Sequence, residues 1–240
     1  MTSVVISQPM LFPWAGFFEL TALADVYVHL DDVQFSKGSL VNRVQIKHSS
    51  GLKWLSVPLA NKGSFQKICD LVPARDGWKP RHREFLRQAF RGAPHVDAAI
   101  DLFDRVYANE RFITLLTASI EETSRTIGLT RPSRWLAASQ LGIGGESWAR
   151  VLAIVQAVGG TRYVTAHGAA NYLDHEAFER AGVTVEYVDY SKTPYAQLHE
   201  PFTAFVSVLD AIANLGASAG AVLRPKTIPW RKFVVEKGAS

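Results

Sequence analysis

Residues 4–35, VVISQPMLFPWAGFFELTALADVYVHLDDVQF, hold the pattern that decides the fold. The apolar run Val4–Ile6 predicts a first strand, and Phe17–Ala24 shows the spacing of a short helix. Apolar and polar residues then alternate over Val26–Leu30, which predicts a second strand. A strand, a helix and a strand at this spacing favour two parallel strands joined by a right-handed crossover.

Polar residues follow both of these predicted strands. Gln8 comes after the first, and Asp31 and Asp32 come after the second. Because ligands of open α/β sheets bind beyond the carboxyl ends of the strands, we expect these groups to form one active-site rim. Neighbouring residues of a strand point to opposite faces, so the two carboxylates are expected to have different partners. A plain strand-to-loop turn is the structural alternative, and the spacing does not favour a metal site.

The remainder of the chain alternates between strand and helix patterns. A hairpin over residues 36–63 is expected to add a strand beside the second strand, and helical periodicity predicts an insertion over about 78–130. Strand and helix signals alternate again over 134–188, a last helix is expected over Phe202–Leu215, and residues 223–233 have no clear period. We therefore predict one α/β domain over residues 1–240. Its Rossmann-like, mostly parallel sheet would have a strand order near 3-2-1-4-5 and carry a helical cap.

Composition narrows the class of protein. The chain of 240 residues has no apolar run long enough for a transmembrane helix and no basic segment typical of a secretory signal. Its one cysteine, Cys69, excludes an internal disulfide. These features favour a soluble, cytoplasmic protein. The net charge of +4 and the pI of about 9.2 suit an anionic partner, such as a phosphorylated ligand or an acidic carrier protein, but no RNA-type motif predicts nucleic-acid binding.

Five further polar residues are candidates for a site. Asn42, Arg43 and Lys47 lie in the predicted hairpin, and the planar fork of Arg43 suits phosphate or carboxylate. His82 lies near the start of a predicted helix, and His167 follows a predicted strand. Either histidine could act as a general base near neutral pH. Exposed hairpin charges and structural histidines are the alternatives.

Several of these residues belong to motifs that resemble the WbqC-like family, which is typified by QP-x-x-FP-x-x-GYF, DDVQF and NR-x-x-IK. The matching residues are Gln8–Pro9, Phe12–Pro13–Trp14, Gly16–Phe17–Phe18, Asp31–Asp32–Val33–Gln34–Phe35, Asn42–Arg43 and Ile46–Lys47. Members of that family resemble enzymes of bacterial surface-polysaccharide (O-antigen) gene clusters, and some have been proposed to be glycine transferases that acylate an amino sugar. The resemblance therefore implies N-acyl or aminoacyl transfer that forms an amide on a nucleotide-linked amino sugar or a natural-product intermediate.

The resemblance also implies roles for individual residues. Asp32 or His82 would act as the base, and Gln8 or Asn42 would donate a hydrogen bond to the developing oxyanion. The expected substrate-binding residues are Pro9, Trp14, Asp31, Gln34, Arg43, Lys47, His167 and Tyr190. Among these, the two basic residues would hold phosphate and the two aromatic residues would wall the acceptor pocket. No metal or tightly bound cofactor is expected, and the acyl donor would be a thioester on carrier phosphopantetheine or coenzyme A.

A second likeness offers an alternative function. The segment Phe12–Phe17 lies where nucleotidylyltransferases carry a DP-x-H-x-GH-type motif, and Trp14 and Phe17 replace its histidines. The alternative is a non-catalytic or degenerate nucleotidylyltransferase-like module that binds a nucleotide sugar.

Overall fold

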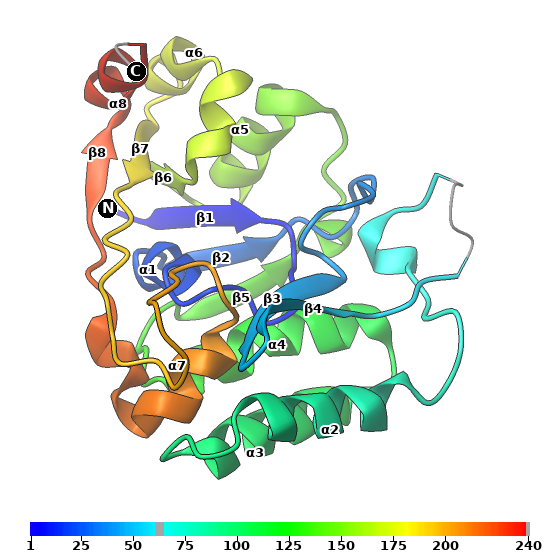
Figure 1. The fold of residues 1–240 in the computed structure, drawn as a ribbon. Helices are drawn as coiled ribbons and strands as arrows, with labels where there is room; N and C mark the ends of the chain where they lie inside the picture. Colours follow the sequence, from blue (N-terminus) through cyan, green and yellow to red (C-terminus); the bar gives the residue numbers. More distant parts are fainter. Residues whose placement is uncertain (61–64, 239–240) are drawn as a thin grey trace.

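A mostly parallel sheet forms the centre of the molecule (Figure 1). The computed structural model describes residues 1–60 and 65–238. Six strands are arranged in the order β5-β2-β1-β6-β7-β8, and β8 alone among them runs antiparallel to its neighbour. Their bounds are β1 Ser3–Ser7, β2 Val26–His29, β5 Arg134–Ala137, β6 Arg162–Thr165, β7 Thr184–Val188 and β8 Thr227–Pro229. The predicted α/β class is therefore confirmed.

The order of the strands differs in detail from the expected one. The hairpin of β3 (Arg43–His48) and β4 (Gly51–Ser56) forms a separate two-stranded sheet. The place beside β2 that we expected it to take belongs to β5, where Arg134 pairs with Val26. The physical reason is the connection: a long helical crossover delivers β5 parallel to β2, while the hairpin buries the apolar face of β3 against a helix instead.

Helices cover both faces of the sheet (Figure 1). One face carries α1 (Phe17–Ala22), α4 (Phe112–Thr126) and α7 (Val208–Leu215), and the other carries α5 (Ser147–Ala157), α6 (His175–Arg180) and α8 (Trp230–Gly238). The alternation of side chains along β1 supplies both cores. Val5 packs in the first, whereas Val4 and Ile6 pack in the second.

The helical insertion expected over about 78–130 corresponds to α2 (Trp78–Ala89), α3 (Val96–Tyr107) and α4. The last of these is a covering helix of the sheet, because its Leu116 is fully buried in the core and its Glu121 lies 3.2 Å from His29 of β2. The other two helices form an outer layer beyond α4 (Figure 1). There α3 packs against α4 and α7, and α2 packs against α3 and β3.

The C-terminal part is more regular than its sequence pattern indicated. Residues 223–233 contain β8 and the start of α8, and Phe233 stacks on Tyr187 of β7 at 4.0 Å. Conversely, α7 begins at Val208 instead of Phe202, because the side chain of Ser207 caps it by accepting from the Leu209 amide. Within residues 1–60 and 65–238, no helix has the length and apolar character needed to cross a bilayer.

Candidate functional site

The carboxyl ends of β1, β2 and β6 lie side by side, and the residues after them define what we call the strand-end crevice: Gln8, Asp32 and His167. The register pairs Val5 with Val164, so continuing it along the two strands puts Gln8 level with His167. Neighbouring strands are about 4.8 Å apart. The two residues therefore follow neighbouring strand ends, and Asp32 follows the strand on the other side of β1.

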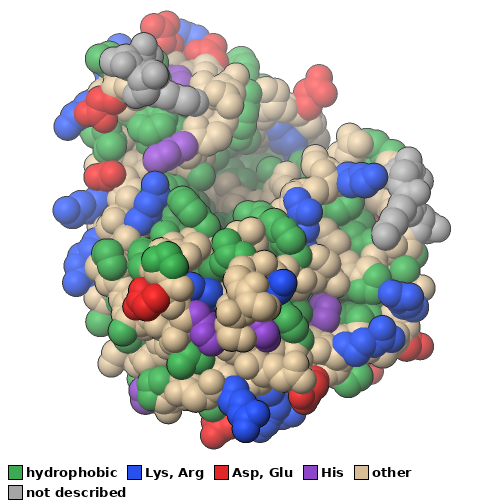
Figure 2. Space-filling model, viewed as in Figure 1, with side chains coloured by type: hydrophobic (Ala, Val, Ile, Leu, Met, Phe, Trp, Pro, Cys, Tyr) green, Lys and Arg blue, Asp and Glu red, His purple; other side chains and the backbone are tan. Residues whose placement is uncertain are grey.

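The crevice lies at the topological switch point of the sheet. The chain leaves β1 toward α1 and leaves β6 toward α6, and these helices cover opposite faces, with Phe18 in one core and Phe178 in the other. Such a divergence opens a space between the two strand ends. Figure 2 shows the surface hollowed near the end of β1, between the half that carries α5 and α6 and the half that carries the hairpin.

Asp31 is bonded into the structure and faces away from this space. Its side chain is buried, and its two oxygens accept hydrogen bonds from the amide of Ser139 at 2.9 Å and from the hydroxyl of the same residue at 2.7 Å. Its carbonyl also accepts from the Cys69 amide at 2.7 Å. The expected substrate-binding role of Asp31 is therefore corrected: this carboxylate joins the ends of β2 and β5.

Asp32 has a different environment one residue later. Its Oδ2 accepts from Nη2 of Arg150 at 2.6 Å, and Nε of that arginine donates to the Ile143 carbonyl at 2.9 Å. The other oxygen, Oδ1, is buried and has no hydrogen-bond partner among the described residues. The pair is largely but not fully buried, so the arginine holds one oxygen of the carboxylate in place and the other is still to be satisfied.

His167 is the exposed histidine of the crevice. Its Nε2 lies 2.7 Å from the carbonyl oxygen of Val188, at the end of the neighbouring strand. A carbonyl can only accept, so Nε2 carries the proton, and the lone pair of the neutral ring is on Nδ1. Within the described part of the chain, Nδ1 has no hydrogen-bond partner. This histidine is therefore oriented as a base.

Aromatic rings form one wall beside His167. Tyr190 packs between this histidine, at 5.3 Å, and Trp14, at 5.0 Å. Burial raises the pKa of Tyr190, so its phenol is neutral at physiological pH. The Trp14 ring lies over Gly16, where an added Cβ would come within 2.0 Å of it, so the close approach requires glycine. Trp14 and Tyr190 therefore lie together beside His167, and their expected role as the wall of an acceptor pocket stays a prediction.

A second space lies on the other side of Trp14, below the hairpin. This hairpin cavity has a volume of about 240 Å³. It is lined by Leu11, Pro13, Trp14, Leu40, Arg43, Val44, Gln45, Trp54 and Phe205. The Arg43 side chain, which we expected to hold phosphate beside Asp32, faces this cavity instead. The predicted single rim is thus divided into two spaces that share Trp14.

His82 lies apart from both spaces. It is buried between α2, α3 and the hairpin, with Nδ1 2.9 Å from the Tyr107 hydroxyl and Nε2 3.2 Å from the Ser56 carbonyl. Burial lowers its pKa to about 4. Both ring nitrogens are occupied and the ring is neutral at physiological pH, so the expectation that His82 acts as a base at the crevice is corrected to a structural role.

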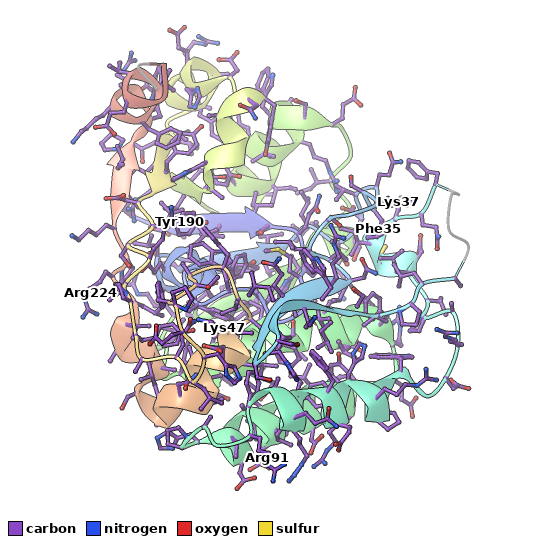
Figure 3. The ribbon with its side chains drawn as sticks, in the orientation of Figure 1. Phe35, Lys37, Lys47, Arg91, Tyr190 and Arg224 are labelled. Atoms are coloured by element: carbon purple, nitrogen blue, oxygen red, sulfur yellow. The ribbon has the colours of Figure 1, made fainter. Side chains whose placement is uncertain are left out.

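Asn42 and Lys47 also stabilise the hairpin. Asn42 donates through Nδ2 to the Val57 carbonyl at 2.8 Å, and its own carbonyl accepts from the Val57 amide. Lys47 is buried beside the loop that follows β7 (Figure 3), where its Nζ donates to Oε1 of Gln197 at 2.6 Å and to the Pro201 carbonyl. The hydrogen bonds of this amide and this ammonium group go to the hairpin and the loop, so in the structure both residues have structural roles in place of the expected oxyanion donor and phosphate clamp.

The remaining predicted residues fall on either side of the crevice. Gln8 is half-buried, and its side-chain amide makes no hydrogen bond within residues 1–60 and 65–238, which leaves it available as a donor. Pro9 is buried behind it. Gln34 is exposed and its backbone bridges to Lys67, so its side chain is not bonded to the crevice.

Sequence reasoning missed the partner of Asp32. Arg150 is the one charged residue of α5, whose remaining side chains are apolar or neutral, and that isolation is the signal that could have found it. Trp54 and Phe205 of the hairpin cavity were also missed, and nothing in their local pattern distinguishes them. Among the described residues, no group of three His, Cys, Asp or Glu side chains could hold a metal ion.

Comparison with known proteins places the chain in a family. The model of the WbqC-like protein family matches residues 8–222. A protein of Mycobacterium tuberculosis (strain ATCC 25618 / H37Rv), described as uncharacterized protein Rv1507c, is 31% identical over 227 residues, which cover 93% of this chain and 98% of that protein. No solved structure matches the chain. The family match covers the hairpin, strands β2, β5, β6 and β7 and every residue of the strand-end crevice, and the chain belongs to the WbqC-like protein family.

Proposed function

We propose that the protein is an N-acyltransferase of the aminoacyl, glycine-transferring type. It would form an amide on the amino group of a nucleotide-linked amino sugar or of a natural-product intermediate, with an acyl thioester on carrier phosphopantetheine or coenzyme A as the donor. Family membership supports this reaction class through the resemblance described above. The observation that carries the proposal is the position of His167, Gln8 and Asp32 around one switch point.

His167 is the base in this mechanism. The attacking amine arrives as an ammonium ion, and Nδ1 of His167 accepts its proton while Nε2 stays bonded to the Val188 carbonyl. The nitrogen lone pair then attacks the thioester carbon and a C–N bond forms. As the C–S bond breaks, the nitrogen loses its second proton to the departing thiolate, which leaves as the thiol, and the proton held by His167 passes to solvent.

Gln8 and Asp32 support the charges that develop. The unpaired side-chain amide of Gln8 donates a hydrogen bond to the carbonyl oxygen as it becomes an oxyanion. Oδ1 of Asp32 accepts a hydrogen bond from a hydroxyl or ammonium group of the acceptor, because this oxygen is otherwise buried without a partner among the described residues. Arg150 holds that carboxylate in place.

A direct assay tests the proposal. Purified protein is incubated with glycyl and other acyl thioesters and with a panel of nucleotide-linked amino sugars, and amide products are detected by mass spectrometry. His167→Ala should lower the rate by about 10²- to 10⁴-fold. The matched control is His48→Ala, since His48 lies at the hairpin turn, and this variant should retain full activity. Equal rates for both variants would remove His167 from the mechanism.

A specific observation favours the alternative, a module that binds a nucleotide sugar without chemistry. Two of the residues expected to be catalytic, Asn42 and His82, are occupied by structural hydrogen bonds. In addition, the segment that corresponds to the nucleotidylyltransferase motif places Phe17 in the core. Saturable binding of a nucleotide amino sugar with no amide product for any donor would support this alternative over the transferase.

A further inference from the structure

The hairpin cavity has the composition of a ligand site, and it is separate from the proposed reaction. We propose that it binds a planar apolar molecule, of about the size of a bicyclic ring, that carries a carboxylate. The proposal uses the shape and charge of the cavity and does not depend on the transferase activity of the crevice.

The apolar character of the cavity extends to its exposed edge. Trp54, Phe205 and Leu40 line it while their residues remain 47%, 54% and 43% exposed. These side chains come from β4, from the loop before α7 and from the segment before β3, so the fold gathers them from distant parts of the chain. Figure 2 shows hydrophobic side chains gathered below the hollow. Exposed apolar groups that meet at one opening are typical of a binding site.

Aromatic rings supply flat walls. Trp14 packs against Phe205 at 4.9 Å between ring centroids, and Trp54 lies on the hairpin side of the same space. Rings set in this way favour a flat ligand, which can stack on one and meet the edge of another. The volume of about 240 Å³ fits a bicyclic ring, because an apolar cavity of about 150 Å³ suffices for benzene.

Arg43 supplies the charge. Its guanidinium lies 4.4 Å from the centroid of the Trp54 ring, and Nη2 donates to the Gly38 carbonyl. Its Nε is buried and has no hydrogen-bond partner among the described residues. Across the same residues, no carboxylate lies within ion-pair distance of Arg43. A buried N–H donor without an acceptor costs free energy, and so does a cation without a counter-charge. A ligand carboxylate would accept a hydrogen bond from Nε and balance the charge of the guanidinium.

The charge count selects a carboxylate over a phosphate. Among the described residues that line the cavity, Arg43 is the one cation, and the expected second cation, Lys47, is bonded to Gln197 and Pro201 instead. A single guanidinium balances a singly charged group, while a phosphate would enter this mostly apolar space with charge left uncompensated.

Three probes of one shape test the inference. 2-Naphthoate, 2-naphthamide and 2-naphthyl phosphate are titrated into the full chain, and binding is followed by calorimetry and by quenching of tryptophan fluorescence, since two tryptophans line the cavity. The carboxylate should bind saturably, and the neutral amide should bind at least about tenfold more weakly. Tighter binding of the phosphate, or equal binding of carboxylate and amide, would overturn the assignment.

Variants locate the site. Arg43→Gln should lose the preference for 2-naphthoate over 2-naphthamide. The control Arg91→Gln should keep it, because Arg91 is exposed just after α2 and does not line the cavity. Leu40→Trp fills the exposed edge while keeping the Arg43 side chain in the sequence, and it should weaken all three probes with an unchanged circular dichroism spectrum. Absence of saturable binding to the wild-type chain, or an Arg43→Gln variant that keeps the preference, would refute the proposal.

Discussion

The polar side chains of the hairpin and those of the strand-end crevice look alike in sequence but differ in how they are bonded. In the hairpin, Asn42 and Lys47 donate to carbonyl oxygens of other segments. At the crevice, Gln8 has an amide with no hydrogen bond within the described residues, and His167 has one nitrogen bonded and one without a partner there. The first group holds segments together, whereas the second has atoms left for a substrate.

Asp31 and Asp32 show the same contrast within two residues. Both oxygens of Asp31 are bonded to Ser139, while Asp32 uses one oxygen for Arg150 and keeps the other unpaired among the described residues. The direction of each side chain at the end of β2 decides this difference, as the alternation of a strand requires. Residue type alone therefore does not separate a structural carboxylate from a functional one, and the completeness of its hydrogen bonding does.

The largest difference between the two regions should come from removing their side-chain amides one at a time. Gln8→Ala should lower kcat/KM for amide formation by about 10²- to 10³-fold, the usual loss for one oxyanion donor, while the free energy of unfolding stays close to wild type. Asn42→Ala should do the reverse. It leaves the Val57 carbonyl without its donor and should lower the free energy of unfolding by about 1–3 kcal/mol, with folded protein fully active.

Chemical denaturation and steady-state kinetics on the same samples measure both effects. Gln8→Glu and Asn42→Asp repeat the test at nearly constant side-chain size, because each replaces the N–H donor by a group that accepts. If Asn42→Ala lowered kcat/KM at full stability, the assignment of the hairpin to a structural role would fail.

The sequence predicted the strand ends well, because their cause is local. The apolar run of β1 and the alternation of β2 are written in consecutive residues, and the polar residues that follow them, Gln8 and Asp32, lie at the crevice for that reason. The switch-point argument then adds His167 from a strand far along the chain, since the parallel order of the sheet brings its carboxyl end beside β1.

What failed depended on partners that are remote in sequence. Lys47 alternates with Ile46 as an outward residue of β3 should, yet a loop whose Gln197 lies 150 positions away covers it. The hairpin was likewise predicted correctly as a pair of strands and given the wrong neighbour, because periodicity specifies that a strand forms and does not specify what it pairs with. The position of Arg43 at the hairpin cavity could not be predicted for the same reason, because it depends on where the hairpin packs and periodicity does not specify this.

A smaller effect should come from His82, the buried histidine beside the hairpin. The pKa of His82 is about 4 in the folded protein and about 6.5 when unfolded, so between these values the unfolded chain binds a proton that the folded chain does not. Stability should therefore fall as the pH drops from 6.5 to 4, by about 3 kcal/mol at most from this residue. Above pH 6.5 the same residue should contribute no pH dependence.

His82→Gln tests this by removing the titration. The difference in free energy of unfolding between wild type and variant should shrink as the pH falls from 7 to 4. Both proteins carry the other titrating groups, so taking this difference cancels the acid sensitivity of those groups. His48→Gln, at the hairpin turn, is the matched control and should show no such convergence. A constant difference for His82→Gln across this range would contradict the buried, neutral state that separates His82 from His167.

The smallest effect should come from Lys47→Met, which keeps the length of the side chain and removes its ammonium. The carbonyl of Pro201 and the Oε1 of Gln197 lose a charged donor, and the free energy of unfolding should fall by about 1–2 kcal/mol. Lys53→Met on the exposed strand of the same hairpin should change it by less than about 0.5 kcal/mol. Because Lys47 ties the hairpin to the loop that carries Phe205, amide hydrogen exchange in that loop should rise in the first variant and not in the second. If amide exchange in the loop stayed unchanged and a phosphorylated substrate bound more weakly to Lys47→Met, Lys47 would be a binding residue. The distinction between a structural hairpin and a functional crevice would then fail.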